Sequence, residues 1–445
     1  MSRTTRTRAI HRGAQALTAV GFVLTVVLTA RHRQAHGSLD PATAGEELVS
    51  ILLVAVVSLL LLTVHVVRPE TERIERLRWT AGVWAVALLA AVVATWFLIE
   101  VDAERDITVG TTLLAQADVE AFLAQHAAVP AGPDGPLLIP TGVFIQSFEF
   151  LNANNVEVAG YVWQTYGPTV PDDVARGFVL PEAVAEAYEA EEAYRIEQDG
   201  GELIGWYFNA TLRQSFDYAR YPFDRQDVWI RLWHRDFDRG VLLVPDLASY
   251  RDLDPATLPG LEAQFVYGSW DPEFTAFSYA TNDYNTDFGF AAGFERAALP
   301  ELYFNVGVKR DFLNPFIAHV AFVLAIAVLL FGLLVLTTDD EDLKGRFGLS
   351  TAGVLGSCSG LLFAVILQHN QIRGATASQQ IVYLETLPFV LYAFIVLVAL
   401  NAILLASPFD LWLVRYRHNL LPVLLYWPAL IGLVWLVTLA YFYWP

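Results

Sequence analysis

The chain has 445 residues, 55% of them hydrophobic, and a formal net charge of −19. Its mean hydropathy of +0.42 is too high for a soluble protein of this size, so we expect a membrane protein in contact with lipid. The only cysteine, Cys358, excludes an intrachain disulfide. With this acidic balance we expect no nucleic-acid partner.

Seven apolar runs are long enough to cross a bilayer, which takes about 20 apolar residues. Two further runs follow the first one closely, and no small-residue cleavage site stands out, so the first run is not a cleavable signal. We predict three spans before a long polar segment and four after it. The runs lie at 14–31, 49–67, 80–99, 315–337, 349–368, 381–406 and 420–443.

The basic residues beside these runs indicate the orientation. They gather before the first span and between spans two and three, four and five, and six and seven, which makes these segments cytoplasmic by the positive-inside rule. We therefore expect a multi-pass protein of the plasma membrane (the inner membrane of a bacterium). Its N-terminus is cytoplasmic, and residues 101–311 and the C-terminus are extracytoplasmic. The basic residues are Arg3, Arg6, Arg8, Arg12, Arg68, Arg73, Arg76, Arg78, Lys344, Arg346, Arg415 and Arg417.

The polar segment is a domain of its own. From Glu100 to Asp311 there are 35 acidic and 13 basic residues, a formal charge of −22, whereas the rest of the chain carries +3. Runs of strands followed by runs of helices indicate separate domains. We predict a three-helix transmembrane bundle at 1–100, a β-sandwich at 101–311 and a four-helix transmembrane domain at 312–445.

Alternating apolar and polar residues predict strands within the acidic domain. Residues 143–150 and 156–166 form a hairpin around a turn at 152–155. The stretch 181–198 is rich in Ala and Glu without Gly or Pro after its start, so we predict a helix there. Its carboxylates make a solvated face, or alternatively a Ca²⁺ or proton sensor. Further strands are expected at 206–216, 228–233 and 302–308.

Two short features flank the start of the fourth span. Residues 221–226 read as a tight turn, in which Pro222 presets the backbone and Asp224 can accept hydrogen bonds from nearby amides. Lys309 and Arg310 directly precede the apolar run at 315–337. Seen alone, the first is a β-turn with a satisfied carboxylate, and the second is a basic pair that keeps its charges at the membrane boundary.

The fifth span is rich in small residues along one helical face, because its members recur at spacings of four, three, four and three. Such a face is either a surface for close helix packing or the lining of a pore with an apolar constriction at Leu355. The candidate pore-lining residues are Gly348, Ala352, Leu355, Ser359 and Leu362.

The turn, the basic pair and the small-residue helix, in this order, resemble the pentameric ligand-gated ion channels, or Cys-loop receptors, over roughly 140–445. The resemblance implies a homopentamer whose pore is lined by the helix near 346–368. It also implies that Asp224 pairs with Arg310 to couple the outer domain to the pore, with Pro222 and Phe223 in the same turn. The two cysteines of animal receptors appear here as Gln214 and Val228, and prokaryotic members also lack that disulfide.

Several aromatic residues of the outer domain lie on segments that resemble the agonist loops of that family. Aromatic boxes hold cations through the ring quadrupole, although aromatic residues in a β-sandwich also build its core. The ligand-binding candidates are Trp163, Trp233, Phe237, Phe277, Tyr279 and Tyr284. The ligand, a small molecule or an ion, cannot be identified from them.

We find no pattern typical of an enzyme, a metal site or a cofactor site, and expect none. The interpretation is a subunit of a ligand-gated ion channel. The alternative is a seven-span sensor with an outer ligand domain and no pore. A transporter would show broken helices or paired repeats.

We favour cations as the permeant ions, since Asp339, Asp340, Glu341 and Asp342 precede the pore helix. The first three spans have no counterpart in the family, and their role, like the end of the pore helix, stays open. Glu385 lies where the family often has an acidic residue.

Overall fold

A computed structural model describes residues 74–101, 109–126, 137–198, 200–236, 240–264, 268–286, 288, 300–339, 349–376, 380–409 and 411–443. The predicted spans at 14–31 and 49–67 lie outside these residues, as do Phe237 and Gly348. The chain divides into two compact units. The first comprises residues 1–104, 315–374 and 380–445, and the second comprises residues 105–314 and 375–379.

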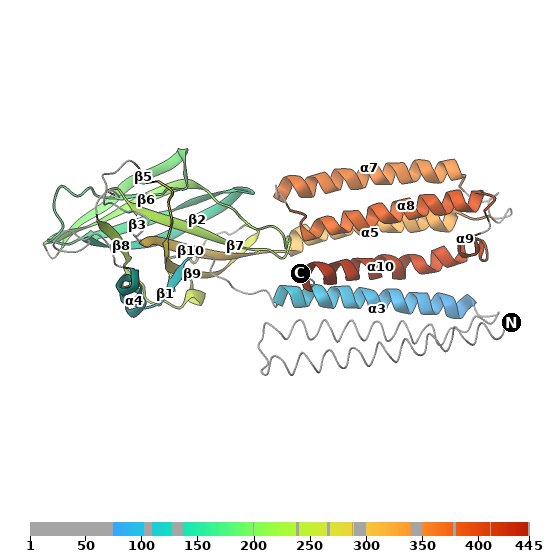
Figure 1. Cartoon of the computed structure of the whole chain (residues 1–445), viewed down its shortest axis with the longest axis horizontal. Coiled ribbons are helices and arrows are strands. Elements are labelled where there is room, and N and C mark those ends of the chain that lie inside the picture. The colour runs from blue at the N-terminus through green and yellow to red at the C-terminus, as the bar shows by residue number, and fades with distance from the viewer. Residues whose placement is uncertain are drawn as a thin grey trace, which may run out of the picture. The chain divides into compact units, whose positions relative to one another are not determined.

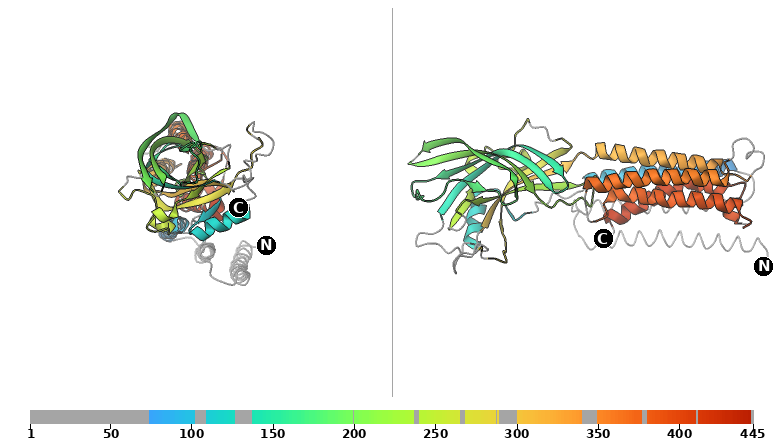
Figure 2. Two further views of the ribbon diagram at one scale, coloured as in Figure 1. Left: turned by 90° about the vertical axis from the view of Figure 1, so that its left-hand side faces the viewer. Right: turned by 90° about the horizontal axis from the view of Figure 1, so that it is seen from above.

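In the first unit, five described helices lie side by side, and each is long and apolar enough to cross a membrane (Figures 1 and 2). They correspond to the last five predicted spans. A 3-10 turn, η4 (Tyr383–Glu385), leads directly into α8, and α9 (Trp412–Arg415) precedes the last helix. The long helices are α3 (Ile74–Val101), α5 (Leu313–Leu336), α7 (Thr351–Thr376), α8 (Thr386–Ala406) and α10 (Leu420–Tyr443).

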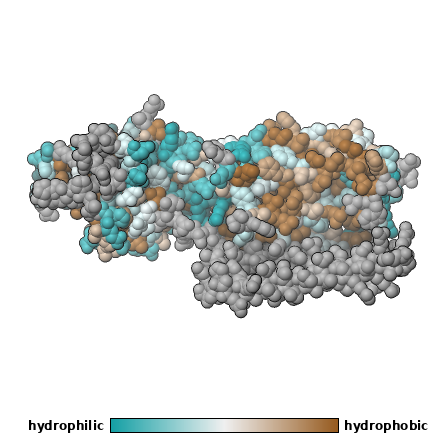
Figure 3. Space-filling model, in the orientation of Figure 1, coloured by the Kyte–Doolittle hydropathy of each residue, from teal (hydrophilic) through white to brown (hydrophobic). Residues whose placement is uncertain are grey.

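The helices of this unit are apolar around most of their circumference, which is typical of membrane spans. Figure 3 shows apolar residues over much of its visible described surface. A few buried polar groups join the helices. Tyr426 of α10 donates a 2.8 Å hydrogen bond to the carbonyl of Ala327 in α5, and the Asn419 amide donates to the carbonyls of Leu334 and Thr337 at 3.2 and 2.9 Å.

The second unit contains two five-stranded sheets and a short helix, α4 (Gln116–His126). One hydrophobic cluster draws its side chains from both sheets. The first sheet has the order β1 (Thr111–Leu113), β9 (Trp270–Thr281), β10 (Pro300–Arg310), β7 (Arg225–His234) and β4 (Phe178–Val179). The second has the order β5 (Ala183–Gln198), β6 (Gly201–Arg213), β3 (Asn155–Tyr166), β2 (Leu137–Asn152) and β8 (Val241–Pro245).

The predicted hairpin at 143–166 is confirmed as β2 and β3, paired antiparallel with Asn152 opposite Asn155. The predicted helix at 181–198 is wrong, because residues 183–198 form strand β5, paired along β6. The sequence signal for this hairpin is the Asp199-Gly200 dipeptide, and Gly200 has a φ of +74°. Pairing with β6 overrides the helical preference of Ala and Glu.

Candidate functional site

The turn before β7 places Asp224 against the end of β10. The Arg310 guanidinium makes a two-point ion pair with the Asp224 carboxylate, Nε to Oδ1 at 2.7 Å and Nη2 to Oδ2 at 3.0 Å. The amide of Arg310 also donates to the Asp224 carbonyl at 3.2 Å. Gln226 Nε2 donates to Oδ2 at 2.9 Å. The Asp224 side chain is only 1% exposed, and both of its carboxylate oxygens have hydrogen-bond partners that replace water.

Aromatic rings surround this pair. The Arg310 guanidinium carbon lies 4.0 Å from the ring centroid of Trp270 and 4.9 Å from that of Tyr221. Burial raises the pKa of Tyr218, whose ring is 5.9 Å away, to about 12. Rings that face a cation stabilise it where water is excluded. Pro222 and Phe223 are buried in the same turn, and Phe223 contacts the ring of Phe312.

Two glutamine side chains close the loop that carries this turn. The amide of Gln214 donates to the carbonyl of Trp229, which follows Val228 in β7. Gln226 binds the backbone of Asp217 at both ends, donating to its carbonyl at 2.7 Å and accepting from its amide at 3.2 Å. These hydrogen bonds hold the loop closed without a disulfide.

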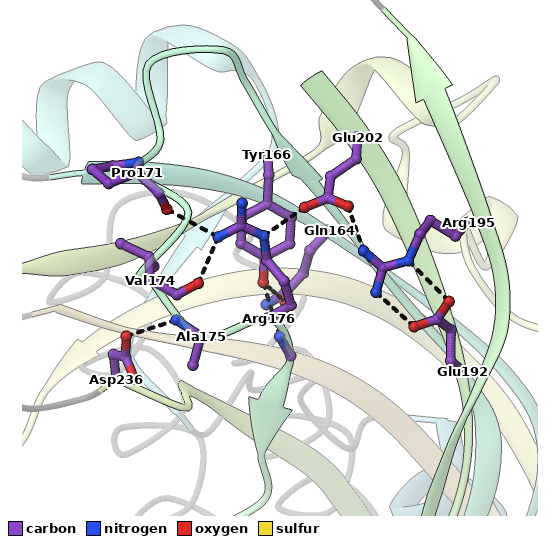
Figure 4. Close-up of polar contacts among 11 residues, drawn as sticks. Gln164, Tyr166, Pro171, Val174, Ala175, Arg176, Glu192, Arg195, Glu202 and Asp236 are labelled. Atoms are coloured by element: carbon purple, nitrogen blue, oxygen red, sulfur yellow. Dashed lines mark hydrogen bonds and ion pairs between the residues drawn. The ribbon is translucent and has the colours of Figure 1, made fainter. Parts of the chain in front are cut away.

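A second network of charges lies at the other end of β6 from the loop that carries Asp224 (Figure 4). Arg176 donates to Glu202 at 2.6 Å, and the other oxygen of Glu202 meets Arg195. Arg195 also pairs with Glu192 at 2.8 Å. Arg176 binds the carbonyls of residues 171 and 174 as well, so the network ties the segment after β3 to the β5–β6 hairpin.

The predicted pore-lining residues lie on α7, apart from Gly348. Ala352 and Ser359 are exposed, whereas Leu355 and Leu362 are half-buried. The adjacent face, with Val354, Cys358 and Val365, is buried in the core of the helical unit. The predicted face therefore borders the buried face, and it is available to a neighbouring chain or a pore. The Ser359 hydroxyl donates to the Leu355 carbonyl of its own helix at 2.9 Å.

A buried ionic cluster joins the end of α7 to the start of α8. Glu385 has no exposed side-chain surface. Its Oε1 lies 2.6 Å from Arg373 Nε and 3.2 Å from His369 Nε2, and its Oε2 accepts a 3.0 Å hydrogen bond from the Val382 amide. An ionised group at membrane depth is costly unless it is paired, and is commonly functional. Sequence reasoning singled out Glu385 but missed its partners, because α7 continues to Thr376, past the predicted end at 368.

The helix α3, which corresponds to the last of the three predicted N-terminal spans, packs against α10. Trp84, Leu88 and Val92 form an apolar cluster with Trp435. Trp435 Nε1 donates to Thr95 Oγ1 at 3.0 Å. Trp96 Nε1 donates to Tyr383 OH at 2.5 Å, and the same hydroxyl is 2.9 Å from Thr438 Oγ1. This helix is therefore bound to the start of α8 as well as to α10.

The structure does not bring all the ligand-binding candidates together. Phe277 and Tyr279 are buried in the core of the β unit, where Tyr279 OH donates to the Leu243 carbonyl at 2.8 Å. Trp163 Nε1 donates to Asp246 at 2.8 Å. Among the described candidates, only Trp233 and Tyr284 meet, with ring centroids 6.1 Å apart.

Charged residues occupy the space beside Trp233 and Tyr284. The Arg231 guanidinium carbon lies 5.4 Å from the ring centroid of Trp233, and the guanidinium pairs with Glu182 and Glu301. Burial raises the pKa of Glu182, against the lowering effect of Arg231. Since the chain's own guanidinium already faces Trp233, this cluster is not an open aromatic box.

No protein-family model matches the chain, and a search of curated proteins finds no similar sequence. The functional interpretation therefore rests on the residues themselves.

Proposed function

We propose that the chain is a subunit of a homopentameric ligand-gated ion channel of the plasma membrane, and that it is not an enzyme. A stimulus at the extracytoplasmic domain, a β-sandwich made of the two sheets, opens a pore lined by α7. The observation that carries the proposal is the Asp224–Arg310 pair. It joins the loop before β7 to the last residue of β10, just before α5 begins at Leu313.

A strand that runs almost directly into a helix can transmit a displacement, since Asp311 and Phe312 are the only residues between them. The pair fixes the end of that strand to the loop, so that a change in one sheet reaches the start of α5. Three further features support the proposal: the exposed small residues of α7, the ion pair between α7 and α8, and the five apolar helices.

The test is the number of subunits together with conductance. We expect the protein purified in detergent to have the mass of five chains, and planar bilayers that contain it to show single-channel currents. Leu355→Ser should wet the apolar constriction and raise the resting current. Leu367→Ser, at an exposed position of α7 away from the predicted face, is the matched control.

A monomeric or dimeric protein, or an assembled pentamer whose resting current is unchanged by Leu355→Ser, would contradict the channel. The first result would favour the seven-span sensor.

A further inference from the structure

The turn between α9 and α10 has a backbone that stores strain. Its residues Arg417, His418 and Asn419 follow one another with φ angles of +47°, +59° and +80°. In this left-handed region the Cβ atom crowds the following carbonyl, and residues other than Gly normally enter it singly. In the rest of the described chain they do so singly, at Leu258 and Phe288. Such a backbone persists only where surrounding contacts hold it.

The contacts that hold the turn come from the end of α5. The Asn419 side chain is only 1% exposed, and its Nδ2 donates to the carbonyls of Leu334 and Thr337 at 3.2 and 2.9 Å. The last carbonyls of a helix need partners from outside it, so Asn419 caps α5. Beside it, His418 Nδ1 lies 2.7 Å from Asp339 Oδ1.

The same segment also reaches the end of α8. Arg415 Nη2 donates to the Ser407 carbonyl, directly after α8, at 2.6 Å. Residues 415–419, here called the clasp, thus join the ends of α5 and α8 to the start of α10. One group of the clasp is left unsatisfied, because Asn419 Oδ1 is buried and has no hydrogen-bond partner among the described residues. A buried acceptor without a partner is costly.

The closed clasp therefore carries two costs, the left-handed backbone and the orphaned acceptor, that an open form would not have. We propose that the clasp is a strained latch that opens locally and so controls how firmly the end of α5 is held to α10. On opening, the backbone at Arg417 and His418 relaxes, Asn419 Oδ1 meets water, and the cap on α5 is lost. The residues after Thr337 lead toward α7, so an open clasp loosens the connection between α5 and α7. This consequence for gating rests on the proposed channel function, whereas the opening does not.

Two backbone amides report on the opening. The Leu420 amide donates to the Tyr416 carbonyl across the turn at 3.1 Å, and the Thr337 amide donates to the Leu334 carbonyl at 3.3 Å. Amides exchange with solvent when a local opening breaks their hydrogen bonds. The measurement is hydrogen–deuterium exchange of the full-length protein in detergent, followed in peptides that contain these two amides.

The test compares Arg417→Gly with Arg417→Ala. Both variants lose the guanidinium, but only Gly removes the Cβ atom that makes the left-handed backbone costly. We expect exchange at Leu420 and Thr337 to be about threefold or more slower with Gly than with Ala. His418→Gly against His418→Ala gives a second pair with the same expected direction. Asn419→Ala removes the cap and should speed the exchange.

Equal or faster exchange in the Gly variants than in their Ala counterparts would overturn the proposal. Slowing by the same factor at amides in the middle of α5 and α10 would also overturn it, because the strain would then be released only by global unfolding. Exchange needs no current, so a protein that does not conduct can still show the clasp, and a conducting one can lack it.

Discussion

Each of the two units buries a carboxylate that an arginine contacts, Asp224 in the β unit and Glu385 in the helical unit, and the two contacts differ. Asp224 receives both nitrogens of a two-point pair from Arg310, whose side chain is 13% exposed and enclosed by aromatic rings. Glu385 receives one short contact from Arg373, whose side chain is 41% exposed, and the same carboxylate oxygen also meets His369. Arg310 and Asp224 meet in one defined geometry, whereas one oxygen of Glu385 contacts two side chains, Arg373 and His369.

The difference indicates which contact is fixed and which can rearrange. A two-point pair in a closed aromatic setting loses most of its energy on any displacement. A carboxylate that a partly exposed arginine and an imidazole share can exchange partners at small cost. We expect the junction at Asp224 to move as one body, and the α7–α8 contact to be the place where the helices rearrange.

The largest expected effect comes from breaking the Asp224 pair. Arg310→Ala leaves a buried, unpaired carboxylate, so we expect a loss of about 3–5 kcal/mol in the stability of the β unit. Thermal unfolding followed by tryptophan fluorescence measures it. A double-mutant cycle with Asp224→Asn should show strong non-additivity, and additive effects would refute the coupling. Arg195→Ala, at an exposed pair, is the control and should cost under about 1 kcal/mol.

His234 tests what a buried ionisable group does without a dedicated ion pair. Burial lowers its pKa to about 4, and its Nδ1 accepts a 3.1 Å hydrogen bond from the Asp236 amide. The folded state thus holds the neutral ring, while the unfolded chain takes up a proton below about pH 6.5. Stability is full above pH 6.5 and falls progressively toward pH 4, by up to about 3 kcal/mol.

His234→Asn keeps an acceptor for the Asp236 amide and removes the titration. Denaturant unfolding at a series of pH values should show a shallower acid-side loss than in the wild type. His126→Asn in α4 serves as the control for the loss of an imidazole from this unit. An identical acid-side slope in the His234 variant would show that other groups cause the loss.

Glu385→Gln tests the corresponding contact in the helical unit. The amide oxygen can still accept from the Val382 amide, and Arg373 is already 41% exposed, so we expect a loss of about 1–2 kcal/mol in stability. The fall in melting temperature in detergent should be clearly smaller than that of Arg310→Ala. A larger fall than that variant shows would mean that the α7–α8 contact is the more rigid one.

Trp96→Phe has the smallest expected effect. It keeps an aromatic ring but removes the hydrogen-bond donor to Tyr383, whose hydroxyl can still bond to Thr438. We therefore expect a loss of about 0.5–1.5 kcal/mol in stability. Melting temperature in detergent measures it. Trp79→Phe, at an exposed position of the same helix, is the control. No change relative to that control would mean that α3 is held by apolar packing alone.

The same contacts bear on the prediction that residues 1–100 are dispensable for the pore but needed for regulation or assembly. Replacement of this segment by a signal peptide removes α3 and its hydrogen bonds to Tyr383 and Trp435. We expect pentamers that still conduct. Intact pentamers that never conduct under a stimulus that opens the full-length protein would place α3 within the channel mechanism.

Much of this architecture could be predicted from local patterns. Five apolar runs and the 143–166 hairpin reappear as helices and strands, because hydropathy and a two-residue alternation are visible within short windows. The β5 strand was missed, since its Ala- and Glu-rich composition favours a helix and only its partner β6 makes it a strand. The end of α7 was missed because its polar residues are satisfied by α5 and α8. Gln368 meets His319, and His369 meets Glu385.

The amino acids alone determine where charge lies along the chain and how many apolar runs it has. They also determine the order of the turn, the basic pair and the small-residue helix. Which groups meet was decided by packing. Asp224 and Arg310 are adjacent because β7 and β10 pair in register, and the Asn419 amide reaches the end of α5 because α10 docks on that helix. Hydrogen-bonding register and helix docking depend on partners distant in sequence, and no local window contains the free energy of those contacts.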